Sequence, residues 1–265
     1  MSVETKKVRV EFSRGERVVS LWLASPKANV LDQTMAEELT GALNSLREHR
    51  SLRAIVIRPE GPHFSFGASV EEHLPVQIGA ALTRLRTLLS ALLTSSAPTI
   101  AAVRGQCLGG GLELALGCDL IMAEENAKLG LPEIKLGVFP PAGAALLPVR
   151  IGASRASELV LTGRSLTGSE AQRAGLVARL VPEGTLDAEL SSLLENEFLP
   201  RSAPALRYAS KASRRALLAA VHEDLPELEH LYLEELMDQP DAEEGIRAFL
   251  EKRAPRWTDD ERIQP

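Results

Sequence analysis

One stretch of the chain, residues 99–133, constrains the fold more than any other. An apolar Thr-Ile-Ala-Ala-Val run leads through Arg-Gly-Gln-Cys-Leu to three glycines at 109–111, and an apolar segment carrying Glu113 follows. This order predicts a buried strand, a tight turn and a helix. A helix that opens on glycines presents N–H groups to a negative charge, and Glu113 and Glu133 can move protons beside it. The stretch is therefore typical of an active site, although glycines that only relieve crowding between a helix and a sheet would give the same pattern.

The composition predicts an ordinary globular protein. The chain has 265 residues, of which 45% are apolar, a net charge of -6 and a pI near 5.5. This acidity argues against a nucleic-acid partner, and we interpret the one basic cluster, residues 207–215, as a solvated helix face. Because no run of 18 apolar residues occurs and the N-terminus lacks the apolar block of a signal peptide, we expect a cytoplasmic protein without a membrane partner.

Several other kinds of site are not predicted. Cys107 and Cys118 have no CxxC partner and are interpreted as small packing residues, and the five histidines lack ligand spacing, so no metal is expected. A dinucleotide fingerprint starting at Gly109 fails because Leu114 stands where its third glycine is required. No GK[ST] or GxSxG motif follows a strand, which argues against a phosphate loop and a serine hydrolase.

Hydrophobic periodicity predicts strand-then-helix units followed by a helical layer. We expect an antiparallel strand pair, further strands, helices in both halves, and amphipathic helices from residue 186 onward that break at Pro200, Pro226 and Pro240. The leucine stripe of the last helices is interpreted as core rather than as a subunit interface. The expected strands are 8–12, 18–23, 52–58, 99–103 and 177–181, and the expected helices are 33–48, 79–93, the segment with Glu113, 144–149, 155–161 and 168–174.

Two acids and two turns predict the chemistry of the site. Glu113 lies in an apolar segment, where burial would raise its pKa toward the range useful for a general acid or base. Its alternative role is to satisfy the dipole at a helix N-terminus. Glu133 begins another segment with apolar neighbours, and the turn at residues 63–69, with Gly67, would expose the N–H of Ala68 as a second donor toward an oxyanion.

These features together resemble the crotonase superfamily, the enoyl-CoA hydratase and isomerase group, over essentially the whole chain. The matching pieces, in order, are SPKANVL at residues 25–31, the FGAS turn, GQCLGGGLELALGCDLIMAE, LPEIKLGVFP, LTGRSLTGSEAQRAGLV and FLEKRAPRW. The resemblance implies an α/β spiral of ββα units, residues 1–196, with a helical C-terminal trimerisation region, residues 197–265. It also implies a homotrimer or a dimer of trimers, and no cofactor beyond the coenzyme A of the substrate.

The resemblance also implies roles for individual residues. The N–H groups of Ala68 and Gly110 would hold a thioester oxygen, Glu113 would handle water, and Glu133 would exchange a proton at carbon. The residues implied in CoA binding are Lys27, Ala28, Phe249 and Lys252. Retention of both glutamates favours a hydratase over an isomerase that needs one, or over a CoA-binding or assembly protein that has lost catalysis.

Two departures from the family pattern concern the acyl group. Ser69 stands where many relatives have aspartate, and Pro141 stands where ordinary enoyl-CoA hydratases have a glycine whose N–H holds water. Water must then be positioned differently. The FSFGASVEEHLP and GVFPPAGAALLP runs resemble the branch of the family that adds water in a 1,4 sense to cyclohexa-1,5-diene-1-carbonyl-CoA.

The acyl pocket is expected near four residues, Phe66, His73, Phe139 and Pro141. The two phenylalanines are equally consistent with ordinary core positions, and His73 with an exposed helix face.

Overall fold

A six-stranded sheet forms the centre of the computed structural model, which describes residues 6–25 and 28–258. Its strand order is β1-β2-β3-β4-β6-β9. As predicted, β1 pairs antiparallel with β2, and the remaining neighbours pair parallel. The strands are β1 (Val8–Ser13), β2 (Val18–Leu23), β3 (Ala54–Pro59), β4 (Thr99–Val103), β6 (Leu120–Glu124) and β9 (Arg179–Val181).

A second, three-stranded sheet makes the chain a spiral. It consists of β5 (Gln106–Leu108), β7 (Lys128–Gly130) and β8 (Ser165–Thr167). Between β4 and β7 the chain alternates between the two sheets, and the bridges Leu31–Ala68 and Ser65–Cys107 extend the smaller one. These three-residue strands were not predicted, because they are too short to show an alternating pattern.

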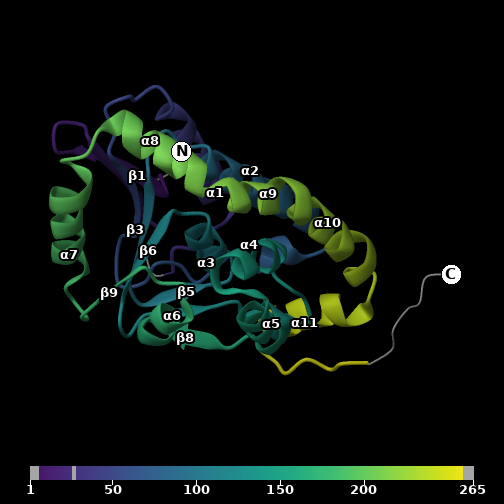
Figure 1. Ribbon diagram of the computed structural model, residues 1–265. Coiled ribbons are helices and arrows are strands. Elements are labelled where there is room, and N and C mark those ends of the chain that lie inside the picture. Colours follow the sequence, from purple (N-terminus) through teal and green to yellow (C-terminus); the bar gives the residue numbers. More distant parts are fainter. Residues whose placement is uncertain (1–5, 26–27, 259–265) are drawn as a thin grey trace, which may run out of the picture.

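Helices cover the spiral and continue beyond it (Figure 1). The α-helices of the first part are α1 (Gln33–Ser45), α2 (Ile78–Leu93), α3 (Gly110–Leu116), α4 (Pro141–Ile151), α5 (Ala153–Thr162), α6 (Gly168–Ala174) and α7 (Leu186–Leu193). Those after it are α8 (Ala203–Ser213), α9 (Arg215–Ala219), α10 (Leu225–His230) and α11 (Pro240–Leu250). Short 3-10 helices occur at η1 (Glu71–His73) and η2 (Pro132–Leu136), and π-helical turns at η3 (Leu194–Phe198), η4 (Ala220–Asp224) and η5 (Leu231–Leu236).

The predicted helix break at Pro226 is wrong. Figure 1 shows α8, α9 and α10 following one another as a single rod across the molecule. Pro226 lies in the first turn of α10, directly after the π-helical turn η4. Because the bonding register changes there, no N–H is required at this position. Pro240 does begin a new helix, and Pro200 lies in the turn before α8.

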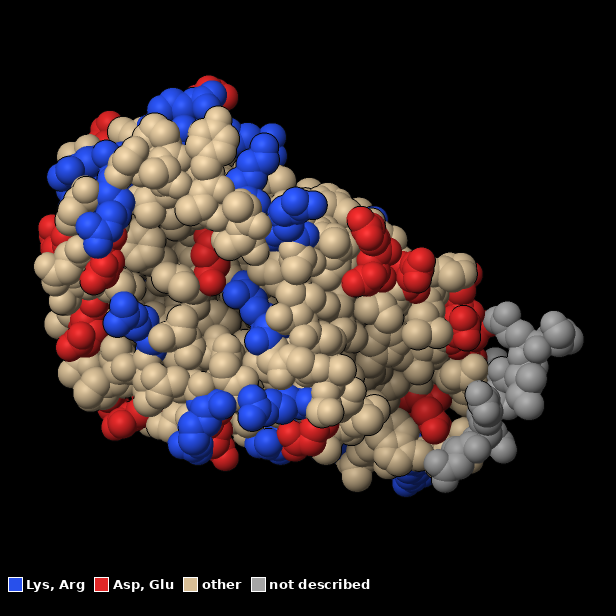
Figure 2. Space-filling view, viewed as in Figure 1, with Lys and Arg blue, Asp and Glu red and all other residues tan. Residues whose placement is uncertain are grey.

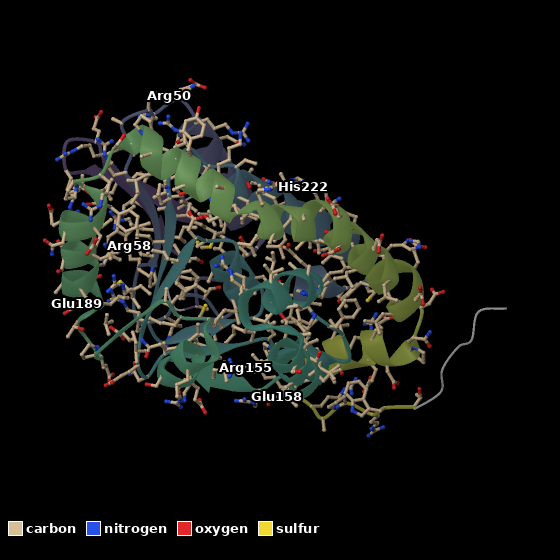
Figure 3. The ribbon with its side chains drawn as sticks, in the orientation of Figure 1. Arg50, Arg58, Arg155, Glu158, Glu189 and His222 are labelled. Atoms are coloured by element: carbon tan, nitrogen blue, oxygen red, sulfur yellow. The ribbon has the colours of Figure 1, made fainter. Side chains whose placement is uncertain are left out.

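Three hydrophobic clusters hold these layers together. The largest lies between the spiral and α1, α2, α4 and the C-terminal rod, and a second fills the space between the central sheet and α7. Arg58, labelled in Figure 3, projects from β3 toward α7, where it pairs with Asp187. Of the predicted leucine stripe, Leu228, Leu233 and Leu236 pack against the clusters, whereas Leu231 is 40% exposed.

Figure 2 shows basic and acidic side chains interspersed on the visible surface, without a face that carries charges of one sign only. In the described part of the chain, no helix is both long and apolar enough to cross a bilayer.

Candidate active site

A cavity of about 660 Å³ opens beside the N-terminus of α3. Its walls come from the FGAS turn, α2, α3, the segment from η2 to the start of α4, and the C-terminal elements η5 and α11. The spiral and the helical layer therefore both contribute to it. The residues predicted from the sequence that line this cavity are Phe66, Ala68, His73, Gly110, Glu113, Glu133, Phe139, Pro141 and Phe249.

Two residues with unpaired backbone amides, Ala68 and Gly110, line the cavity next to each other. A Cβ atom on Gly110 would lie 3.1 Å from the nitrogen of Ala68, closer than side chains normally pack, so the two turns are in tight contact. Neither amide donates to an acceptor within the described residues. Gly67 (φ +106°) and Gly109 (φ +50°), the residues before these two amides, have positive φ angles that favour glycine. Such a pair can bind one oxygen that becomes negative.

The FGAS turn is held by residues that sequence reasoning did not select. Ser65 Oγ accepts from the Gly67 N–H at 3.0 Å and donates to the carbonyl oxygen of Asn29 at 2.7 Å. The Asn29 side chain donates to the carbonyl oxygens of Glu60 and His63. The sequence indicated Ser65, because a serine two residues before a turn glycine typically bonds to the backbone. Asn29 is 36 residues away in the chain, so only the fold brings it to the turn.

Glu113 is held at the N-terminus of a second helix. Its side chain is buried, and Oε1 accepts from the Gly143 N–H in the first turn of α4 at 2.7 Å. Burial raises the pKa of Glu113 above its usual range, and hydrogen bonds from Gly143 and Ala142 oppose that rise. Pro141 is the first residue of α4, where an N–H has no intrahelical partner, so the proline fits this position without losing a bond.

Glu133 lies opposite, at the start of the 3-10 helix η2. A Cβ atom on Gly109 would lie 2.8 Å from Glu133 Oε1, so only glycine leaves room for this carboxyl group. Its other oxygen, Oε2, is buried without a hydrogen-bond partner among the described residues. Burial raises the pKa of Glu133, and the nearby charge of Glu113 raises it further. The pair therefore favours one ionised and one protonated carboxyl group.

The residues predicted to form the acyl pocket, His73, Phe66 and Phe139, line the cavity wall. His73 is half-buried on the wall, where its Nδ1 lies 2.8 Å from the Ser69 carbonyl oxygen and burial lowers its pKa, so the exposed alternative is wrong. Phe139 lies edge-on to Tyr232, a wall residue that sequence reasoning missed. Phe66 is 44% exposed at the cavity.

Of the four residues implied in CoA binding, the structure places one on the cavity wall. Phe249 is 55% exposed on the cavity wall, whereas Ala28 and Lys252 are not part of that wall. The carbonyl oxygen of Ala28 accepts from the Phe66 N–H at 2.9 Å. This bond connects the segment around Ala28 to the FGAS turn. Lys27 lies outside the described residues.

Fold and site together define an α/β spiral protein in which two buried carboxyl groups and two unpaired backbone amides line one cavity. The chain belongs to the enoyl-CoA hydratase/isomerase family, whose model matches residues 13–261. The predicted crotonase fold is confirmed by solved structures. An enoyl-CoA hydratase from Mycobacterium avium subsp. paratuberculosis superposes with a TM-score of 0.84 at 28% identity, covering 96% of this chain and 99% of that one.

Sequence relatives support the resemblance to the branch of the family that acts on cyclic dienoyl-CoA thioesters. The chain is 43% identical to a cyclohexa-1,5-dienecarbonyl-CoA hydratase from Thauera aromatica, covering 97% of this chain and 99% of the relative. It is 38% identical to a 2,3-dehydroadipyl-CoA hydratase from Escherichia coli, covering 92% and 96%.

Proposed function

We propose that this protein is an acyl-CoA hydratase that acts on a cyclic conjugated dienoyl thioester. The observation that carries the reaction class is the position of Glu113 and Glu133 on one cavity with the free amides of Ala68 and Gly110. The identity to the Thauera aromatica hydratase supports the cyclic acyl group.

In the proposed reaction, the two backbone amides and the two glutamates each have one role. The amides of Ala68 and Gly110 bind the thioester oxygen and stabilise the enolate that forms there. Glu113, which accepts two amide hydrogen bonds and therefore ionises more readily, takes a proton from water. The water oxygen bonds to the β-carbon, and the electron pair of the double bond moves onto the thioester oxygen. Glu133 then gives its proton to carbon, so that one water molecule has been added.

A cyclic diene allows the proton to reach a more distant carbon. In cyclohexa-1,5-diene-1-carbonyl-CoA the enolate extends over the second double bond, and protonation at its far end gives the 1,4 product. That product keeps a double bond conjugated with the carbonyl group. Phe66 and Phe139 offer flat surfaces for such a ring at the cavity wall.

The wider proposal includes CoA binding and assembly. Lys27, Ala28, Phe249 and Lys252 would contact the CoA moiety, which is part of the substrate, so no other cofactor is needed. The helical region from residue 197 would form a trimer, or a dimer of trimers, in the cytoplasm. Analytical ultracentrifugation tests the assembly.

The first test is a mass-spectrometric assay with crotonyl-CoA and cyclohexa-1,5-diene-1-carbonyl-CoA in parallel. We expect fast water addition to the cyclic diene and little to crotonyl-CoA, and ¹⁸O from solvent water in the product, which an isomerase would not incorporate. The reverse preference would make the acyl assignment wrong and leave the hydratase assignment standing.

Variants then test the mechanism. Glu113→Gln and Glu133→Gln should each lower kcat by orders of magnitude while CoA binding persists. Glu124→Gln is the matched control, because Glu124 is buried but lies outside the cavity. Near-normal turnover in both site variants would contradict the two-glutamate mechanism.

A further inference from the structure

Tyr232 has a buried hydroxyl group that the proposed mechanism does not use. The residue lies in η5, is 1% exposed and lines the cavity. Its ring packs edge-on against Phe139, with ring centroids 5.4 Å apart and an interplanar angle of 63°. Ile78, Ala242 and Ile246 surround it in the third hydrophobic cluster, so its orientation is set by packing.

The Tyr232 hydroxyl has no hydrogen-bond partner among the described residues. A buried polar group without a partner is costly, so its retention needs an explanation. Glu133 Oε2, which is also unpartnered on this cavity, is explained by the proton that it gives to carbon. Nothing in the reaction yet explains Tyr232.

Tyr232 lines the same cavity as both carboxyl groups. Burial raises the pKa of Tyr232 and the charges of Glu133 and Glu113 raise it further, so the phenol keeps its proton and remains a donor. The donor and the proposed base, Glu113, therefore belong to one cavity.

The reacting water lacks a backbone donor on the α4 side. Pro141 has no N–H, and the next amides, those of Ala142 and Gly143, bond to Glu113. A donor from another element is therefore needed, and Tyr232 approaches from the C-terminal layer.

We propose that the Tyr232 O–H donates a hydrogen bond to the oxygen that is added to the acyl ring, first as water and then as the ring hydroxyl. This inference rests on the proposed function, and it makes Tyr232 a determinant of selectivity for ring thioesters that carry an oxygen beside the carboxyl-bearing carbon.

The experiment compares two inert ligands of the purified protein, benzoyl-CoA and 2-hydroxybenzoyl-CoA. Their aromatic rings resist addition, and they differ in one oxygen at the ring position that receives water. Calorimetry gives the ratio of their dissociation constants for the wild type, Tyr232→Phe and Tyr208→Phe. Tyr208 is the chain's other tyrosine and is 69% exposed, so it is the matched control.

We expect the wild type and Tyr208→Phe to prefer the hydroxylated ring, and Tyr232→Phe to lose about tenfold of that preference, the usual strength of one hydrogen bond. An unchanged ratio in Tyr232→Phe would overturn the proposal. So would equal weakening of both ligands together with a lower Tm, because that outcome indicates a purely structural role.

Turnover separates this inference from the proposed function. Tyr232→Phe should lower kcat on the cyclic dienoyl thioester about tenfold or more, with KM changed less than about threefold. A wild type that hydrates no thioester but keeps the binding preference would refute the hydratase assignment and leave standing only the selectivity of Tyr232 for a ring oxygen. Failure to bind either ring would refute both.

Discussion

The Gly143 amide donates a 2.7 Å hydrogen bond to Glu113 Oε1, joining the first turn of α4 to the buried carboxyl group of α3. The partial positive charge of a helix N-terminus favours the ionised form of that carboxyl group. For Glu133, burial and the nearby charge of Glu113 outweigh one hydrogen bond from its own backbone N–H, so it is the member of the pair that keeps its proton. The two glutamates are thereby distinguished by their surroundings.

This asymmetry predicts a bell-shaped dependence of kcat/KM on pH. At low pH both carboxyl groups are protonated and no base is available, and at high pH both are ionised and no acid remains. Because both pKa values are raised, the maximum should lie well above the usual carboxyl range. Initial rates between about pH 5 and pH 10 measure the profile. A flat profile would contradict the assignment of one base and one acid.

The close contact between Gly110 and Ala68 predicts that a single added methyl group lowers activity strongly. Gly110→Ala would place a Cβ atom 3.1 Å from the Ala68 nitrogen, where the substrate oxygen must approach. We expect kcat to fall about 10²- to 10³-fold, as when one oxyanion donor is lost. Gly41→Ala, on α1 with no neighbour within 4 Å, is the control and should keep full activity. Unaltered turnover in Gly110→Ala would place the oxyanion site elsewhere.

Pro141→Gly tests how the chain selects its acyl group. The Glu113–Gly143 bond should persist, and a new N–H becomes available to hold water. We expect the ratio of crotonyl-CoA to cyclic dienoyl-CoA hydration to rise, and Tm to fall by a few degrees because glycine increases the entropy of the unfolded chain. Parallel assays of both thioesters give this ratio, and no change would show that Pro141 does not set the preference.

Glu133→Gln should stabilise the protein at alkaline pH while it removes activity. The folded-state pKa of Glu133 is raised, so the native state holds its proton where the unfolded chain has lost it, and unfolding becomes easier as pH rises through that range. Below the usual carboxyl range both states are protonated and this cost is absent. Thermal unfolding should show a higher Tm for the variant at about pH 8.5, with little difference at about pH 4.5. Equal Tm values at both pH values would argue against the raised pKa.

Arg214 should be essential for attaching the helical layer. It is 2% exposed, pairs with Asp119 and donates to the carbonyl oxygens of Leu93, Ser95 and Ala97. Arg214→Met removes the ionic partner of Asp119, which keeps only its hydrogen bonds from Thr99, and we expect a loss of about 3–5 kcal/mol in the free energy of unfolding. Urea denaturation measures it. The adjacent, exposed Arg215 provides the control, since Arg215→Met should change little.

The sequence alone determined the strand–glycine–helix unit, the antiparallel first pair and the two acids in apolar surroundings. Each of these depends on neighbours along the chain, namely alternation, glycine at a turn, and a charged residue among apolar ones. The motifs in their order also determined the family.

Tertiary structure decided what those residues contact. Pro226 continues a helix because a π-helical turn precedes it, and His73 lies on a cavity wall formed by distant segments. The Glu113–Gly143 bond and the position of Tyr232 join residues far apart in the chain. Local patterns report the preferences of adjacent residues, whereas burial, pKa and an unpartnered hydroxyl arise only when separate elements exclude water around a shared cavity.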